Sequence, residues 1–201
     1  MHLCFGAAGL RNFMFAITTE RLVLRPPEAA DMAPLFALFN DWSVVEWLSA
    51  PPWPYTLADM EGFIARMRTA TAPDREVFFV ITHAGQPIGG LSWRERPANR
   101  LQSGAGPNVG YWLGASHWGR GYMTEAVGGL AGHVFATSDA NAIYSSAFTG
   151  NATSLRVQSK LGFVRDGETM LRSNPQNADL PLIKTVLTRP AFAAANSRKR
   201  P

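Results

Sequence analysis

The chain has 201 residues, of which 46% are hydrophobic and only 17% are charged. This length predicts one domain, and the composition excludes the low hydrophobicity and high charge of intrinsically disordered chains. The single cysteine, Cys4, excludes an internal disulfide framework, and no run of about 18 apolar residues is available to cross a membrane. We therefore predict a soluble protein of the reducing cytoplasm.

The formal net charge of +4 does not predict nucleic-acid binding, because much of it comes from the end of the chain. Arg198, Lys199 and Arg200 are three of the 19 basic residues, and the others nearly balance the 15 acidic ones. A nucleic-acid interface requires basic residues clustered on one face. The four histidines are not spaced as metal ligands, so we expect neither a nucleic-acid partner nor a metal site.

Neither end of the chain shows the apolar periodicity of a core element. The first sixteen residues lack a basic n-region and are interrupted by Arg11, which disfavours a signal peptide. We expect a loose extension over 1–16, or translation that begins at Met14, and a basic disordered tail over 193–201. The folded domain is then expected over 17–192.

Apolar spacing predicts the first elements in chain order. Alternation of apolar and polar residues predicts a strand over 17–25, and apolar residues at i, i+3, i+4 and i+7 predict a helix over 28–40. The Trp- and Pro-rich passage over 42–55 predicts a short helix followed by a loop. Thr56 and Asp59 resemble a capping box at the start of a second amphipathic helix.

The rest of the chain predicts more strands than helices. Two strands, over 76–82 and 87–93, are joined by a short connection that contains Gly85, which indicates a hairpin. Residues 96–107 are rich in Pro, Gly, Asn and Ser and predict a long mobile loop. The remaining elements are a strand over 109–113, a helix over 124–137, a strand over 143–148, a helix over 154–161, and two closing strands over 163–171 and 180–188. This order favours an α/β (α+β) fold in which a mixed central sheet of about seven strands carries helices on both faces.

The most informative segment runs from a strand into a helix over 109–130, VGYWLGASHWGRGYMTEAVGGL. Gly119 and Gly121 lie in the turn before the helix, where backbone N–H groups lack partners and glycine lets a large anion approach. This arrangement suits a pyrophosphate, to which Arg120 could add a charged contact. The spacing alone also fits an ordinary tight turn. A Rossmann motif would need a third glycine where Thr124 stands, and no P-loop Gly-Lys-Ser/Thr is present.

A second segment, NATSLRVQSKLGF over 151–163, follows the predicted strand over 143–148. Asn151 fits a helix N-cap, Ser154 lies at or near the third helical position, and Gly162 ends the helix. Helix chemistry explains nearly every position of this segment. It does not explain why a strand leads into Asn-x-x-Ser beside an anion-binding loop.

Together, and in this order, the two segments resemble the GNAT superfamily of N-acetyltransferases, and more closely its ribosomal-protein N-terminal acetyltransferase (RimJ/RimL-like) branch. The opening TTERLVLRPPEAAD and the closing LTRPAF resemble the ends of that branch. The resemblance covers roughly residues 17–192. It implies a single GNAT-like domain that is splayed between the fourth and fifth strands and binds acetyl-CoA, as cosubstrate, in the resulting cleft.

The resemblance also implies roles for particular residues. The pantetheine arm of acetyl-CoA would pair with the strand that contains Tyr111, Trp112 and Leu113, and Asn151 would contact this arm or an ordered water. Ser154 matches the position proposed to protonate the departing CoA thiolate. The loop expected to hold the pyrophosphate comprises Trp118, Gly119, Arg120, Gly121, Tyr122, Met123 and Thr124. Two of these residues depart from the family pattern, since Trp118 replaces the usual Gln or Arg and Met123 replaces a small residue.

The sequence indicates a catalytic base less clearly. An amine is mostly an ammonium ion at neutral pH, so a base or a water relay must remove its proton. The strand over 109–113 contains no acidic residue. Glu95, at the end of the third strand, is the first candidate, although a solvated strand-end charge is the simpler explanation, and Glu46 is the second. Glu125 is expected to favour the helix N-terminus electrostatically.

We predict an acetyl-CoA-dependent N-acetyltransferase that acetylates a primary amine by direct attack in a ternary complex. The acceptor would be a protein or peptide N-terminus or a small amine, and the protein a monomer or homodimer. The alternative is a non-catalytic acyl-CoA-binding module, which the missing acid on the strand over 109–113 favours.

Overall fold

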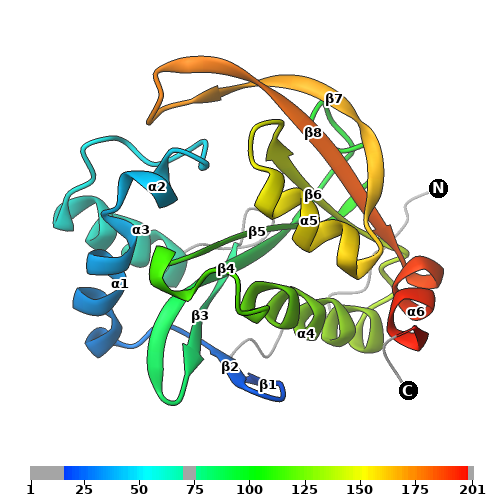
Figure 1. Cartoon of the computed structure of the whole chain (residues 1–201), viewed down its shortest axis with the longest axis horizontal. Helices are drawn as coiled ribbons and strands as arrows, with labels where there is room; N and C mark the ends of the chain where they lie inside the picture. The colour runs from blue at the N-terminus through cyan, green and yellow to red at the C-terminus, as the bar shows by residue number, and fades with distance from the viewer. Residues whose placement is uncertain (1–15, 70–75, 199–201) are drawn as a thin grey trace.

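The computed structural model describes residues 16–69 and 76–198, which build a sheet of eight strands with helices on both faces (Figure 1). The strand order is β1-β2-β3-β4-β5-β6-β8-β7, and β5 and β6 pair in parallel while the other described neighbours are antiparallel. The predicted mixed sheet is therefore confirmed, with one strand more than expected. The strands are β1 (Ile17–Thr18), β2 (Leu22–Arg25), β3 (Val77–His83), β4 (Gln86–Arg96), β5 (Gly106–Leu113), β6 (Ala142–Phe148), β7 (Val164–Ser173) and β8 (Ala178–Thr188). The helices are α1 (Met32–Phe39), α2 (Trp42–Val45), α3 (Leu57–Thr69), α4 (Tyr122–Thr137), α5 (Ala152–Leu161) and α6 (Arg189–Ser197), with 3-10 turns η1 (Ala29–Asp31) and η2 (Ala115–His117).

Two apolar cores lie on opposite faces of the sheet. One core contains residues of α1, α2 and α3, and the other contains residues of α4 and α5, which Figure 1 shows as a separate group. β3 contributes to both cores, because Phe78 and Val80 pack in the first and Phe79 and Ile81 in the second. A strand buried on both faces has a nearly continuous apolar sequence, which explains the run EVFFVIT.

The sheet opens between β5 and β6. β4 and β5 pair at eight successive positions, whereas β5 and β6 pair at a single position, Asn108↔Tyr144. Just past this pair, the Ser145 hydroxyl donates a hydrogen bond to the Val109 carbonyl at 3.0 Å. Beyond it, β5 leads into α4 and β6 leads into α5. The splay predicted between the fourth and fifth strands is therefore confirmed, if β1 and β2 are counted as the single predicted strand over 17–25.

The extra strand arises because a turn divides the segment over 17–25. The Thr19 hydroxyl accepts the N–H of Leu22 at 3.1 Å, and the Thr19 N–H donates to the Leu22 carbonyl at 2.9 Å. The chain thus reverses direction, and β1 pairs with β2 in an antiparallel manner. Alternation of apolar side chains is compatible with one longer strand, so the hydrogen bonds of Thr19 decide the turn.

The loop predicted over 96–107 is present but shorter than expected. β4 continues to Arg96 and β5 already begins at Gly106. Between these strands the chain folds around the fully buried side chain of Gln102, whose amide donates hydrogen bonds to three backbone carbonyls of this connection. The Pro, Gly, Asn and Ser residues here form a compact, internally bonded turn.

The domain boundary predicted at 192/193 falls inside α6, so the disordered tail is wrong for residues 193–197. Thr188 caps this helix by accepting the N–H of Ala191 at 3.3 Å. The guanidinium of Arg189 bonds the carbonyls of residues that follow the end of α4, at 2.7 and 2.9 Å. The alanines of the tail are strong helix formers, and an anchored helix can use them. Residues 199–201 and most of the loose extension expected over 1–16 lie outside the described residues.

Replacing Phe192 with Ala should lower the free energy of unfolding by about 1–3 kcal/mol, because a partly buried aromatic contact is lost. The ring of Phe192 lies 5.5 Å from that of Phe135 and packs against the core under α4. Denaturant unfolding would measure the change, with Asn196→Ala, an exposed position on the same helix, as control. Equal stability of the two variants would contradict docking of α6.

Candidate active site

A cavity of about 410 Å³ lies where the sheet opens. Its wall includes residues from β4, β5, β6 and the beginning of α5, together with the passage that follows α2. Seven of the residues expected from the sequence to contact the cosubstrate lie on this wall: Tyr111, Trp112, Leu113, Trp118, Met123, Asn151 and Ser154. The other expected residues, Gly119, Arg120, Gly121, Tyr122 and Thr124, belong to the adjoining loop and helix start but are not on the wall.

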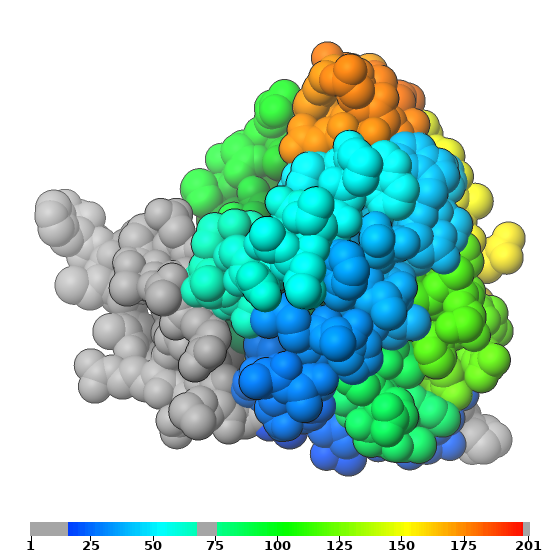
Figure 2. Space-filling model, turned by 90° about the vertical axis from the view of Figure 1, so that its left-hand side faces the viewer, coloured from blue at the N-terminus to red at the C-terminus, as the bar shows by residue number. Residues whose placement is uncertain are grey.

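Beside the cavity, two parts of the chain that are far apart in sequence are joined by hydrogen bonds. The turn between β7 and β8 bonds the passage after α2, since Asn174 donates to the carbonyls of Ser49 and Ala50, and Gln176 donates to the carbonyl of Glu46. Figure 2 shows this orange hairpin resting on the blue and cyan segments that contain α1, α2 and α3. The passage is thus held in place over the opened sheet.

The loop between β5 and α4 has the backbone geometry of an anion site. Gly119 and Gly121 have φ angles of +75° and +79°, which other residues adopt only with strain, and Gly121 is the N-cap of α4. No side chain among the described residues caps this helix, so its first N–H groups are available to a ligand. Trp118, which departs from the family pattern, closes the loop by donating its indole N–H to the Leu113 carbonyl at 2.9 Å.

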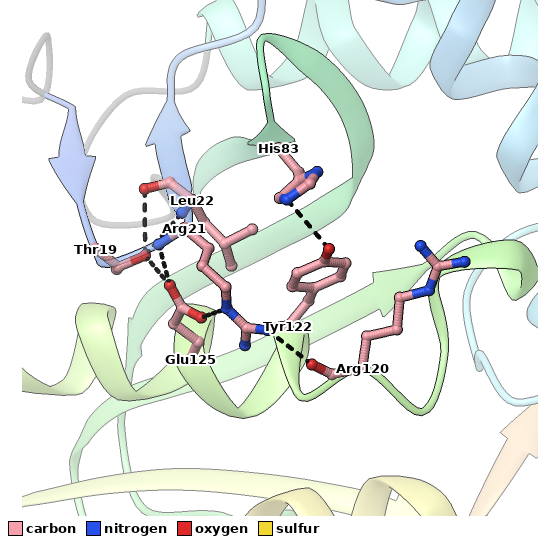
Figure 3. A network of polar contacts seen from close by, with 7 residues as sticks. All are labelled: Thr19, Arg21, Leu22, His83, Arg120, Tyr122 and Glu125. Atoms are coloured by element: carbon pink, nitrogen blue, oxygen red, sulfur yellow. Dashed lines mark hydrogen bonds and ion pairs between the residues drawn. The ribbon is translucent and has the colours of Figure 1, made fainter.

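A polar network anchors this loop to the turn between β1 and β2 (Figure 3). The Glu125 carboxylate accepts hydrogen bonds from the Thr19 hydroxyl at 2.6 Å and from the backbone N–H and Nε of Arg21, both at 2.7 Å. Burial raises the pKa of Glu125, but these hydrogen bonds outweigh it and hold the pKa below its usual range. Arg21 then donates to the carbonyl of Arg120 at 3.1 Å. Glu125 therefore positions the loop as well as favouring the helix N-terminus.

Tyr122 forms the second part of this anchor. The Arg21 guanidinium lies 4.7 Å from the centre of the Tyr122 ring, and the Tyr122 hydroxyl lies 3.1 Å from Nε2 of His83 at the end of β3 (Figure 3). Burial lowers the pKa of His117, and the nearby Arg120 and His83 lower it further. The lowered pKa favours the neutral form of His117, so Arg120 is the residue that supplies positive charge within the loop itself.

Gly121→Val should weaken acetyl-CoA binding by about 10-fold or more, because loss of a charge-assisted backbone contact has roughly that effect. A Cβ at this position would lie 3.4 Å from Nη2 of Arg21, and the positive φ would be strained. Stability should fall by only about 1–2 kcal/mol. Calorimetric titration of the folded variant with acetyl-CoA measures the effect.

Gly85→Val is the matched control for this prediction. Gly85 has a φ of +78°, nearly that of Gly121, but lies in the hairpin between β3 and β4 with no atom within 4 Å of its Cβ position. The control should lose similar stability and bind acetyl-CoA normally. Wild-type affinity in Gly121→Val would contradict the assignment of the loop.

A hydrogen-bonded cluster surrounds Ser154 on the other side of the opening. Asn151 is confirmed as the N-cap of α5, because its side chain accepts the N–H of Ser154 at 3.0 Å. The Ser154 hydroxyl lies 3.0 Å from that of Tyr111, and Gln158 donates to Tyr111 at 3.1 Å. Burial raises the pKa of the Tyr111 hydroxyl, and the hydrogen bonds of Ser154 and Gln158 oppose this only in part. The phenol therefore keeps its proton at neutral pH.

Neither predicted base lies on the cavity wall. Side chains alternate along a strand, and Arg94 and Arg96 of β4 line the cavity, so the exposed Glu95 between them points to the opposite face. Partial desolvation raises the pKa of Glu95, but the side chain is not on the cavity wall. The backbone carbonyl of Glu46 accepts a hydrogen bond from Gln176, and Glu46 is also absent from the cavity wall.

The acidic residue on the cavity wall is Glu76, which directly precedes β3. Its carboxylate lies 3.4 Å from Nη2 of Arg94, and the side chain of Glu76 is only 19% exposed. In the sequence, Glu76 is the unremarkable polar start of a predicted strand. The position of the Glu76 side chain relative to β5 depends on the order and register of β3, β4 and β5. The sequence contains no local signal for this order or register.

Two further properties concern the described residues, 16–69 and 76–198. None of their helices combines the length and the apolar character needed to cross a bilayer. Among the same residues, no three His, Cys, Asp or Glu side chains are grouped as metal ligands would be.

Comparisons with known proteins agree with this geometry. The acetyltransferase (GNAT) domain family matches residues 21–164 of the chain. The chain is similar to the uncharacterized N-acetyltransferase p20 of Bacillus licheniformis, with 26% identity over 158 residues that cover 77% of this chain and 85% of that protein. The fold is similar to that of Mycobacterium smegmatis RimJ in complex with CoA-disulfide, with a TM-score of 0.76 at 19% identity over 94% of this chain and 96% of that one. It is also similar to RimL, a ribosomal L7/L12 α-N-protein acetyltransferase in complex with coenzyme A, with a TM-score of 0.74 at 16% identity over 88% of this chain and 99% of that one.

The opened sheet, the uncapped helix start and the adjoining cavity are the features expected of an acyl-CoA-binding protein. Because the family match covers most of the chain, the chain belongs to the acetyltransferase (GNAT) domain family. It is an acetyltransferase, and acetyl-CoA is its cosubstrate.

Proposed function

We propose that this acetyltransferase transfers the acetyl group directly to a primary amine while both substrates occupy the cavity. Acetyl-CoA supplies an activated thioester. The observation that carries the proposal is the continuity of the cavity. It extends from Trp118 in the loop between β5 and α4 (residues 114–121, called the anion loop), past Ser154, to Glu76 and Arg94. A donor held by the loop and an acceptor that enters beside Glu76 would therefore meet at the opening between β5 and β6.

Glu76 would serve as the general base in place of Glu95. It is the carboxylate on the cavity wall, and its ion pair with Arg94 holds it in one position. β3 lies two strands from β5, or about 10 Å at the usual spacing. Glu76 would therefore remove the proton of the acceptor ammonium through a short chain of ordered waters.

Ser154 would protonate the departing thiolate. Its hydroxyl lies on the cavity wall and is hydrogen-bonded to Tyr111, whose phenol remains protonated. When Ser154 donates its proton to sulfur, the Tyr111 hydroxyl would stabilise the resulting alkoxide by donating a hydrogen bond along the 3.0 Å contact, and a water molecule would return a proton to Ser154. The N–H groups of β5 beyond Asn108, where pairing with β6 ends, would stabilise negative charge on the thioester oxygen.

The decisive experiment is acceptor-dependent release of CoA thiol, with the product identified by mass. The acceptors would be small amines, amino acids and peptides with free N-termini, the last suggested by the similarity to RimJ and RimL. A transferase releases thiol only with a suitable acceptor. The alternative is a non-catalytic acyl-CoA-binding module. Such a module would bind acetyl-CoA, but with every acceptor it would release CoA thiol no faster than background hydrolysis does.

A further inference from the structure

The part of the cavity that faces β3 and β4 carries more positive than negative charge. The acidic and basic side chains on the cavity wall are Glu76, Arg94 and Arg96. Glu76 and Arg94 lie 3.4 Å apart and compensate one another. Arg96 remains as an excess positive charge at the end of β4.

Arg96 lacks a partner within the described part of the chain. Its Nε is buried without a hydrogen-bond acceptor, and its guanidinium forms no ion pair with any described residue. Burial lowers the pKa of Arg96, and Arg94 lowers it further, while Glu76 raises it in part. A partly buried cation without an anion is costly, and an anionic ligand in the cavity would remove that cost.

The phosphates of the cosubstrate are too far away to be this anion. Arg96 pairs with Gly106 at the beginning of β5, whereas the anion loop follows Leu113 at its end. The length of strand between these residues corresponds to about 23 Å. An anion bound at Arg96 would therefore belong to the second substrate, which in the proposed function enters from the Glu76 side.

We propose that Arg96, with Arg94 beside it, binds a carboxylate or phosphate group of the acceptor, so that the acceptor is an anionic primary amine. This inference rests on the proposed function and names its substrate class. The planar guanidinium fork fits both carboxylates and phosphates. Arg94 pairs with Asn108 at the opening, and Arg96 lies two residues further along β4. The anionic group would therefore lie about 7 Å from the reacting amine, a separation that a short spacer provides.

The first test compares acceptors that differ only in the anionic group. β-Alanine would be compared with propylamine, and O-phosphoethanolamine with ethanolamine, by kcat/KM for CoA release. A tripeptide Ser-Asp-Glu and its neutral analogue Ser-Asn-Gln, both with amidated C-termini, would distinguish a small acceptor from an acidic peptide. We expect at least one anionic member to exceed its neutral partner by about 10- to 100-fold, the range of a charged hydrogen bond.

The second test removes the charge with Arg96→Gln and retains it with Arg96→Lys. Arg96→Gln should abolish most of the preference for the anionic acceptor and change kcat/KM for its neutral partner less than about threefold. Arg96→Lys should retain part of the preference. Arg100→Gln is the control, because Arg100 is exposed and not on the cavity wall. Equal use of anionic and neutral acceptors by the wild type, or equal losses for both in Arg96→Gln, would overturn the inference.

A binding measurement separates this inference from the proposed function. β-Alanine and O-phosphoethanolamine would be titrated calorimetrically into wild type and Arg96→Gln, each saturated with CoA. Binding that depends on Arg96 in a protein that acetylates no amine would support the anion subsite and reject the transfer reaction. Acetylation of neutral amines alone, with no binding of either anion, would support transfer and reject the subsite.

Discussion

Ser154→Ala should reduce kcat by about 100-fold or more, while the Kd for acetyl-CoA stays within about threefold of wild type. The Ser154 hydroxyl lies on the cavity wall and is 3.0 Å from the Tyr111 hydroxyl. Under the proposed function, its removal would interrupt proton delivery to the thiolate. The helix cap should survive, because Asn151 accepts the backbone N–H of residue 154, which alanine retains. Steady-state kinetics, calorimetry and unfolding on one preparation would measure all three quantities.

Asn151→Ala is the control for this prediction. It removes the cap of α5, which costs about 1 kcal/mol of stability, but leaves the Ser154 hydroxyl in place. Asn151→Ala should lose stability and some affinity for acetyl-CoA, because Asn151 also lies on the cavity wall, but should keep most of kcat. The opposite pattern in Ser154→Ala would separate helix capping from proton transfer. If Ser154→Ala turns over within a few-fold of wild type, the thiolate leaves unassisted or takes its proton from water.

Glu76→Gln should reduce kcat by about 10²- to 10⁴-fold near neutral pH, the usual contribution of a general base. The amide retains the size of the side chain but cannot accept a proton from water. Binding of acetyl-CoA should change little, because Glu76 lies on the part of the cavity remote from the anion loop. The residual rate should rise with pH, since more of the acceptor is then already unprotonated.

Glu95→Gln is the matched control on the opposite face of β4. Its kcat should remain within about threefold of wild type, because Glu95 is not on the cavity wall. The two variants make the same Glu-to-Gln exchange at the ends of neighbouring strands, and the two side chains point to opposite faces of the sheet. A large loss in Glu95→Gln with normal turnover in Glu76→Gln would reject Glu76 as the base.

Much of this molecule follows from local patterns in its sequence. The apolar spacing of 28–40, the Thr56–Asp59 box and the Asn151 cap each depend on residues only a few positions apart, and each is present in the structure. The glycines at 119 and 121 mark the loop because their conformation depends on the residue itself. The order of these local signals along the chain is also typical of the acetyltransferase (GNAT) family.

The remaining features depend on contacts between distant parts of the chain. Arg21 and Glu125 are 104 residues apart, and their ion pair anchors the anion loop only because β1 and β2 lie beside α4. The Ala-rich end becomes a helix because Arg189 and Phe192 dock on α4, which its composition does not indicate.

The proposed catalytic base shows most directly why local sequence does not identify every residue of the site. Glu76 and Glu95 both lie at ends of predicted strands, and their local sequences do not distinguish them. A strand sends alternate side chains to opposite faces, so the register of β3 against β4 and of β4 against β5 decides which carboxylate faces the opening. Sequence by itself determined most of the strands and helices and the glycine turn before α4, since short-range chemistry encodes them. The tertiary structure decided which side chains share the cavity, because long-range strand pairing brings them together.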